Sequence, residues 1–261
     1  MPQDSPIISG RLFVPRSRAL VTDVLRLHRL VPTCAHDRRF QLDDLSEMRT
    51  RLASRISWSV LFLKAYSAVS ARNPKLLQTW RTWPFAHVFQ QAEPVATVAT
   101  NRRFQDEDWL LWGRIQSPQS CSLVQIQNQM DRFVNGPVEE VFRQQLQFSL
   151  VPALLRRFVW WWNLNLSGEK RAKRVGTFLL TTLAGRQTEI SHPPGFLTSS
   201  LTYGPLAADG SCRVTLVYDH RLMDGAFVAD RLAELEAELK GAILAELRDL
   251  AAEEAALKRA A

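Results

Sequence analysis

A histidine followed four positions later by Asp-Gly is the feature of this sequence best suited to chemistry. The segment reads HRLMDG over residues 220–225, and it lies where a strand is expected to end and a helix to begin. A histidine at a strand end is anchored by backbone on one side and open to a cleft on the other, so His220 can act as a general base. The alternative is a surface turn in which Asp224 only caps the following helix.

Hydrophobic spacing gives the elements that must position His220. Apolar residues at helical spacing predict helices over residues 19–30, 44–52, 58–72, 120–134 and 138–150, and a long helix from Gly225. Short β-branched or aromatic segments predict strands over residues 94–100, 109–115, 177–182, 198–203 and 213–218, and another that ends at Phe40. Because strands and helices alternate without a regular βαβ repeat, the fold class is α+β, with a mixed sheet flanked by helices.

Composition limits the classes of protein that this chain can belong to. The 261 residues are 46% hydrophobic and 23% charged, which suits one globular domain. Apolar runs stop short of a membrane-spanning length, the first residues do not read as a secretory signal, and three scattered cysteines support neither disulfides nor a zinc site. We therefore expect a cytoplasmic protein with no metal.

Charge is unevenly distributed along the chain. Residues 1–231 carry a net charge of +10 and residues 232–261 a net charge of −3. The basic part can attract an anionic partner, which leaves open a nucleotide, an acidic carrier protein, a nucleic acid or an anionic lipid.

Two motifs carry a resemblance to a known family. Residues 214–239, VTLVYDHRLMDGAFVADRLAELEAEL, resemble the C-terminal signature of the chloramphenicol acetyltransferase and dihydrolipoamide acyltransferase superfamily. Residues 176–185, GTFLLTTLAG, resemble the family's Gly-Thr-Phe strand, which carries a hydroxyl residue. The resemblance divides the chain into an N-terminal arm (1–11), a catalytic domain (12–248) that diverges over 149–174, and a helical tail (249–261).

The resemblance implies a chloramphenicol acetyltransferase-like fold, a homotrimer with active sites between subunits, and relatives that build larger cages. His220 would be the general base, and Thr181 of the neighbouring chain, where the family most often has Ser, would donate a hydrogen bond to the oxyanion. Asp224, Gly225 and Arg18 would support the site, with Arg18 paired to Asp224 so that His220 keeps one tautomer.

The implied reaction moves an acyl group from a thioester to a thiol, hydroxyl or amine acceptor. We expect no tightly bound cofactor, and a CoA or phosphopantetheine thioester as donor, the latter on an acyl carrier protein. Because the sequence shows no lipoyl-bearing domain, we favour a free-standing transferase. The alternatives are a non-catalytic trimeric scaffold of the same fold and a peripheral membrane-associated protein.

Residues 151–174 hold three consecutive tryptophans, Trp160, Trp161 and Trp162, which cannot share one helix face. The favoured interpretation is packing at a trimer interface or in the wall of an acyl pocket. The alternative is a helix at the surface of the inner membrane, with basic residues meeting anionic lipid. The basic residues concerned are Arg156, Arg157, Lys170, Arg171, Lys173 and Arg174. Nucleic acid is disfavoured, since no recognised motif accompanies them.

Overall fold

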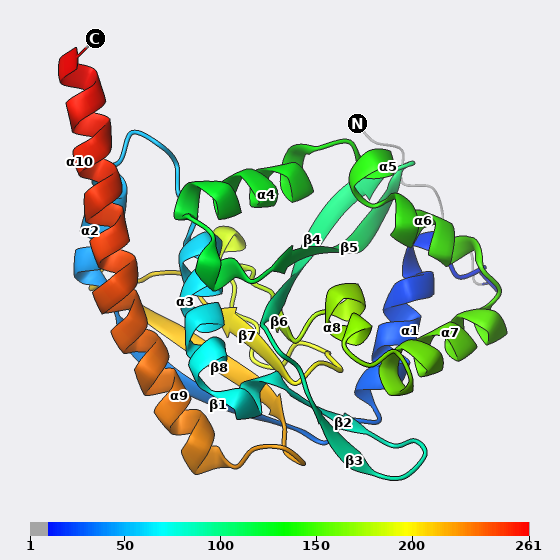
Figure 1. The fold of residues 1–261 in the computed structure, drawn as a ribbon. Coiled ribbons are helices and arrows are strands. Elements are labelled where there is room, and N and C mark those ends of the chain that lie inside the picture. Colours follow the sequence, from blue (N-terminus) through cyan, green and yellow to red (C-terminus); the bar gives the residue numbers. More distant parts are fainter. Residues whose placement is uncertain (1–9, 261) are drawn as a thin grey trace.

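A six-stranded mixed sheet forms the centre of the fold (Figure 1). The computed structural model describes residues 10–260. In spatial order the strands are β1 (Thr33–Gln41), β8 (Ser211–Asp219), β7 (Ser199–Tyr203), β6 (Phe178–Leu180), β4 (Val95–Phe104) and β5 (Glu107–Gln116). The β7–β6 and β6–β4 pairs are parallel and the others are antiparallel. The predicted α+β class with a mixed sheet and flanking helices is confirmed.

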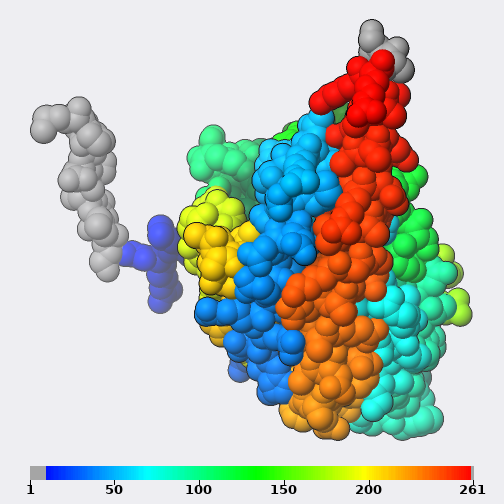
Figure 2. Space-filling model, turned by 90° about the vertical axis from the view of Figure 1, so that its left-hand side faces the viewer, coloured from blue at the N-terminus to red at the C-terminus, as the bar shows by residue number. Residues whose placement is uncertain are grey.

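Helices pack against this sheet and extend along one side of it. The long ones are α1 (Ala19–His28), α2 (Asp43–Arg51), α3 (Trp58–Arg72), α4 (Leu123–Asn135), α7 (Ala153–Asn165), α9 (Gly225–Glu238) and α10 (Leu244–Ala260). The short ones are α5 (Val138–Val141), α6 (Arg143–Leu150) and α8 (Lys170–Val175). A π-helical turn, Leu239–Ile243, joins α9 to α10, and together they form one continuous rod (Figures 1 and 2).

The structure differs from the predicted elements in three places. Residues 138–150 form two helices, α5 and α6, because the backbone leaves the helical conformation at Phe142. A short hairpin of β2 (Gln78–Arg81) and β3 (His87–Gln90) was not predicted. Helix α2 begins at Asp43, one residue before the predicted start at residue 44, and Leu42 occupies its N-cap position.

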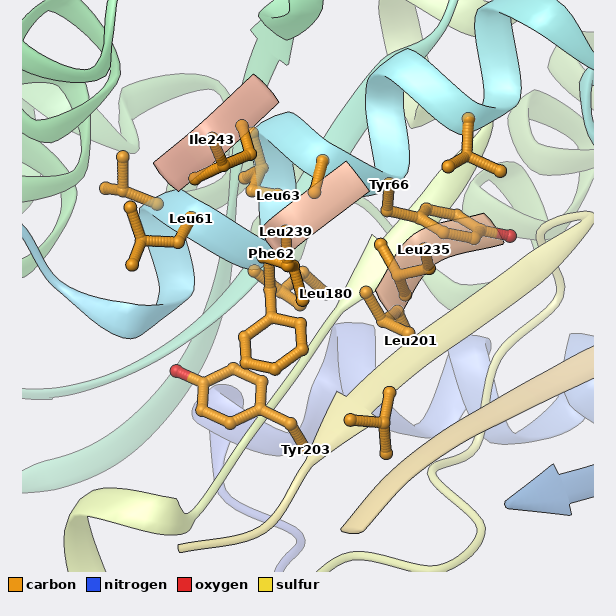
Figure 3. Packing of buried hydrophobic residues seen from close by; sticks show 14 of the residues in the cluster. Leu61, Phe62, Leu63, Tyr66, Leu180, Leu201, Tyr203, Leu235, Leu239 and Ile243 are labelled. Atoms are coloured by element: carbon orange, nitrogen blue, oxygen red, sulfur yellow. The ribbon is translucent and has the colours of Figure 1, made fainter. Parts of the chain in front are cut away.

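The main core lies between α3 and the sheet (Figure 3). Phe62 of α3 stacks on Tyr203 of β7, with ring centroids 4.4 Å apart and planes 12° apart. Tyr66, one helical turn later, packs edge-on against Phe178 of β6, with ring centroids 4.8 Å apart. Its hydroxyl forms a 2.7 Å hydrogen bond with the Ser199 hydroxyl. Residues four apart share one face of a helix, so these two aromatic side chains fix α3 across β6 and β7.

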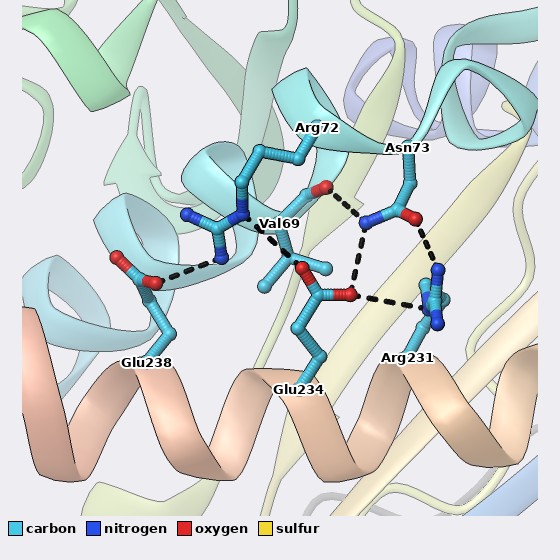
Figure 4. A network of polar contacts seen from close by, with 6 residues as sticks. All are labelled: Val69, Arg72, Asn73, Arg231, Glu234 and Glu238. Atoms are coloured by element: carbon cyan, nitrogen blue, oxygen red, sulfur yellow. Dashed lines mark hydrogen bonds and ion pairs between the residues drawn. The ribbon is translucent and has the colours of Figure 1, made fainter.

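A polar network fixes α9 against the end of α3 (Figure 4). Glu234 of α9 accepts hydrogen bonds from Arg72 at 3.2 Å and from Asn73 at 3.0 Å. Glu238, one turn later, accepts from the Nη2 of Arg72 at 2.8 Å. Arg231 pairs with Glu234 at 3.2 Å and also hydrogen-bonds the Asn73 side chain. Because α9 begins at Gly225, this network also sets the position of the turn that carries His220.

We expect Glu234→Ala to lower the free energy of unfolding by about 1–3 kcal/mol, because several charge-assisted hydrogen bonds lose their acceptor. Urea denaturation measures this change. The matched control is Glu253→Ala on the exposed face of α10, which should change stability by less than about 0.5 kcal/mol. Equal effects of the two substitutions would contradict the role given to the network.

Candidate active site

His220 follows directly after β8, at the end of the sheet. Its backbone N–H donates to the Pro32 carbonyl at 3.0 Å, which ties the strand end to the segment before β1. Its side chain is half exposed, and its Nδ1 lies 3.8 Å from the Asp224 carboxylate. That separation is too long for a hydrogen bond. The backbone of His220 is therefore held while its imidazole stays accessible, as a general base requires.

Two residues that the sequence analysis did not single out flank His220 and hold it. Asp219 is buried and accepts from Arg221 at 2.9 Å on Nε and 2.6 Å on Nη2. The same carboxylate accepts from the backbone N–H of Arg221 at 3.1 Å, and the guanidinium lies 5.3 Å from the Trp80 ring centroid. A bidentate pair is geometrically specific, so it fixes the turn around the histidine. The signal in the sequence was a carboxylate at a strand end with an arginine two positions later.

On its other side His220 lies beside the Tyr218 ring, which in turn is close to His36 and Cys34. Its ring lies 5.6 Å from that of Tyr218, and the Tyr218 ring lies 5.4 Å from that of His36. Burial, together with the neighbouring Cys34 thiol, raises the pKa of Tyr218 to about 12, so the phenol stays neutral at pH 7. Cys34 and His36 belong to β1, opposite Tyr218 and Leu216 of β8.

Asp224 and Gly225 support the site differently from what we expected. Asp224 occupies the N-cap position of α9, but its carboxylate makes no capping hydrogen bond and is 86% exposed. Gly225 does not need a left-handed backbone, since its φ is not positive. A Cβ there would lie 2.5 Å from Cε1 of His36, so a larger residue would force the imidazole of His36 to move.

Arg18 does not reach Asp224 within one chain, contrary to the expected pair. Arg18 is exposed and stands at the start of α1, whereas the His220 turn contacts residues beyond the other end of that helix, at Leu30 and Pro32. Ten residues of helix separate the two ends by about 15 Å. Over residues 10–260, His220 is the basic side chain within ion-pair distance of Asp224. The two form an ion pair only when the imidazole is protonated.

Thr181 follows directly after β6. Its backbone N–H donates to the Leu201 carbonyl at 3.1 Å, and its half-buried hydroxyl has no hydrogen bond within the described part of the chain. The next residue differs, because the Thr182 hydroxyl donates to the Tyr203 carbonyl at 2.8 Å and accepts from the Ala184 N–H at 3.0 Å. Of the two adjacent threonines, Thr181 is the one with a hydroxyl available to a ligand.

One chain does not bring Thr181 and His220 together. Thr181 is bonded to Leu201, Leu201 pairs with Leu216, and His220 lies four residues beyond Leu216. At the usual strand dimensions the two residues are separated by about 13 Å along the strands and about 10 Å across them. A hydrogen-bonded site that uses both side chains therefore needs a second copy of the chain.

A cavity of about 530 Å³ lies beside the Thr181 segment. Thr182, Trp58 and Tyr203 contribute to its walls, and Arg49 and Arg55 contribute positive charge. The Arg49 guanidinium lies 5.1 Å from the Trp58 ring centroid. Burial lowers the pKa of Arg49, because it disfavours the charged form of the guanidinium. The positive charge of Arg55 lowers that pKa further. An anion would be stabilised in this cavity.

The three tryptophans of α7 point to different surroundings, as predicted. Trp160 packs inward and donates from its Nε1 to Asp23 at 3.2 Å. Trp161 and Trp162 are partly exposed. The Trp161 ring lies edge-on to Trp83 of the β2–β3 loop, with ring centroids 6.0 Å apart.

Two of the basic residues that the alternative membrane interpretation placed against lipid are buried. Arg156 forms an ion pair with the buried Asp23 at 2.7 Å, and Arg171 is 4% exposed. Neither can contact a headgroup, which corrects that part of the membrane interpretation. Within residues 10–260, no helix has both the length and the apolar character needed to cross a bilayer.

Solved structures match this chain, although no family model and no curated protein matches its sequence. A dihydrolipoamide acetyltransferase from Azotobacter vinelandii is 18% identical, with 95% of this chain and 100% of that chain covered and a TM-score of 0.62. A probable dihydrolipoamide acetyltransferase from Listeria monocytogenes is 13% identical, with 89% and 94% covered and a TM-score of 0.60. The cubic core of a pyruvate dehydrogenase multienzyme complex is 16% identical, with 95% and 100% covered and a TM-score of 0.59.

The chain therefore has the chloramphenicol acetyltransferase-like fold of the dihydrolipoamide acyltransferase catalytic cores, as the resemblance predicted. The Azotobacter structure was determined to investigate the catalytic role of a serine, a histidine and an asparagine four positions after that histidine.

We expect Gly225→Ala to destabilise the fold by about 1–3 kcal/mol, because the added methyl group collides with His36. Urea denaturation provides the measurement. In a His36→Ala background the same substitution should cost much less. Gly241→Ala is the control, since nothing lies within 4 Å of the added group, and it should stabilise by about 0.5–1 kcal/mol. A Gly225→Ala cost that is unchanged in the His36→Ala background would disprove the steric explanation.

Asp23→Asn should lower the free energy of unfolding by about 3–5 kcal/mol, because it leaves the buried Arg156 guanidinium without its counter-charge. Asp37→Asn is the matched control, since Asp37 pairs with Arg213 at the surface and should cost less than about 1 kcal/mol. Thermal and urea unfolding of both variants compare the two sites. Similar losses would show that the Asp23 pair is not special.

Proposed function

We propose that this protein is an acyltransferase that moves an acyl group from a thioester to a thiol, hydroxyl or amine acceptor. The proposal rests on one observation, which is that the His220–Asp224 motif and the acetyltransferase fold occur together in this chain. The chain has the fold of the dihydrolipoamide acetyltransferase cores, and its His220 and Asp224 have the spacing of the histidine and asparagine studied in the Azotobacter enzyme. In this proposal Thr181 supplies the hydroxyl that we assign to the role of the serine studied in that enzyme.

The chemistry requires a base, an oxyanion donor and a leaving thiol. Neutral His220 removes the proton from the acceptor as the acceptor attacks the thioester carbonyl. The carbonyl oxygen becomes an oxyanion, and the Thr181 hydroxyl donates a hydrogen bond to it. Collapse of the tetrahedral intermediate breaks the carbon–sulfur bond, and the imidazolium of His220 returns its proton to the departing thiolate. The base is thereby regenerated.

The site lies between two subunits of a homotrimer in this proposal. Sheet register separates Thr181 from His220 within one chain, so the His220 of one subunit would face the Thr181 of the next. A cyclic assembly repeats the same contact at every interface and gives one site for each chain. The related cubic core shows that this fold also supports larger assemblies, and a cage of trimers is a further possibility for this chain.

The acyl donor that fits best is a CoA thioester or the phosphopantetheine thioester of an acyl carrier protein. Both carry phosphate, and the cavity beside Thr181 offers Arg49 and Arg55 over an aromatic wall. Arginine binds phosphate through parallel N–H donors, and the apolar wall can cover the pantetheine arm. The acceptor then approaches from the His220 side.

The test is complementation between two inactive variants. His220→Ala and Thr181→Ala should each be inactive alone, with Thr181→Ala losing about 100- to 1,000-fold. When the two are co-expressed at equal levels, about a quarter of the interfaces of a cyclic trimer combine an intact His220 with an intact Thr181. Activity should recover to about that fraction. The assay follows release of CoA from acetyl-CoA with dihydrolipoamide, and then with a series of thiol, hydroxyl and amine acceptors.

Three controls make the result interpretable. Thr181→Ser should retain activity, because the donor is kept, and His87→Ala removes a half-buried histidine of β3 that has no part in the proposed site. Size-exclusion chromatography with light scattering checks that each variant assembles as the wild type does. A wild-type protein that releases no CoA with any acceptor would instead favour a trimeric scaffold. Wild-type turnover without recovery in the mixed assembly would disprove the shared site.

A further inference from the structure

A second cavity, of about 110 Å³, lies beside the end of β8. It is enclosed by β2, α8 and the ends of α1 and α7, and most of its wall is apolar. The apolar side chains are Leu27, Leu30, Val31, Trp80, Leu164, Phe196, Leu197 and Leu222. The charged side chains that line it are Arg171, Asp219 and Arg221. This cavity shares no lining residue with the one beside Thr181.

Arg171 is the unusual member of this wall. It is 4% exposed, and its Nε and Nη1 are buried without a hydrogen-bond partner. Within residues 10–260, no carboxylate lies within ion-pair distance of its guanidinium. Burial, followed by the charge of Arg81, lowers the pKa of Arg171 to about 10, so the group remains charged at pH 7. A buried charge with unused donors is costly and calls for a missing partner.

The neighbouring charges do not supply that partner. Asp219 is the carboxylate of the cavity, and both of its oxygens are taken by Arg221. Arg81 is a second buried cation, whose Nη atoms donate to the carbonyls of Asn165 at 3.2 Å and Gly168 at 3.0 Å. Arg171 and Arg221 line the cavity against the carboxylate of Asp219, and the charge of Arg81 also acts on Arg171, so positive charge is in excess and favours an anion there.

We propose that this cavity binds a small carboxylate with a short apolar tail, whose oxygens accept hydrogen bonds from Arg171. Nε and Nη1 of Arg171 have almost no accessible surface, so Nη2 is the donor that a carboxylate in the cavity could reach, and its hydrogen bond would be charge-assisted. The leucine-rich wall would bury an alkyl group, whereas it offers few donors for the remaining oxygens of a phosphate. The volume limits the ligand to a few heavy atoms. This inference is independent of acyl transfer.

The position of the cavity gives the ligand a route to influence His220. Asp219 and Arg221 line the cavity and also flank the histidine in the chain. A bound carboxylate would therefore lie beside the Asp219–Arg221 pair that holds the turn carrying His220.

The experiment titrates the full chain with sodium butyrate and measures binding by calorimetry and thermal unfolding, against sodium chloride at equal ionic strength. Butyrate should bind and raise the midpoint of unfolding, because a ligand that binds the folded state stabilises it. Arg171→Met should weaken butyrate binding at least about tenfold. Lys173→Met removes an exposed charge from the same helix and should leave binding unchanged.

Two further measurements separate a binding role from a structural one. Without butyrate, Arg171→Met should unfold at a midpoint no lower than the wild type, because an unpartnered buried charge has been removed. Leu164→Phe narrows the cavity without altering its charge and should also abolish binding. Wild-type protein that ignores butyrate at millimolar concentrations would overturn the proposal. Inorganic phosphate that binds more tightly than butyrate would overturn the choice of a carboxylate.

Discussion

The backbone of the turn after β8 no longer has the strand's own hydrogen bonds, so other contacts must hold it in place on both sides of His220. The His220 N–H is bonded to the Pro32 carbonyl, and Asp219 and Arg221 on either side of it form a bidentate pair. These contacts use backbone and flanking side chains and leave the imidazole unconstrained. A general base needs this combination, because its backbone must stay in place while its ring exchanges protons.

Both signature motifs could be located from the sequence because each contains a glycine with a steric cause. Gly176, which opens the Gly-Thr-Phe segment, has a φ of 89°, and a Cβ there would lie 2.1 Å from the Thr97 hydroxyl. Thr177 then accepts the Val95 N–H at 3.0 Å and sets the parallel register of β6 on β4. Such a requirement restricts one position to one residue type, so it leaves a clear pattern in the sequence even when the neighbouring atoms come from a distant part of the chain.

The contacts that sequence reasoning missed join residues far apart in the chain. Asp23 and Arg156 are 133 positions apart, and neither residue type reveals that the other will neutralise it in the interior. A run of arginines and lysines ordinarily indicates an exposed surface, so neither the favoured interpretation nor the membrane alternative predicted that Arg156 and Arg171 are buried. The β2–β3 hairpin was missed for a related reason. Its four-residue strands pair only with each other, and packing against other parts of the chain, such as the Arg81 contacts to residues 165 and 168, supplies its support.

Sheet topology also explains why the candidate site is incomplete in one chain. The parallel β6–β7 pair and the antiparallel β7–β8 pair send the ends of β6 and β8 in opposite directions. Thr181 follows the short strand β6 and lies level with the middle of β8, whereas His220 follows the far end of β8, so strand register keeps the two residues apart whatever the side chains do. A change of rotamer or of loop conformation cannot close a gap set by strand register. The same hydrogen bonds that hold Thr181 and His220 in place therefore keep them apart in one chain, which is why the proposed site is drawn between two copies.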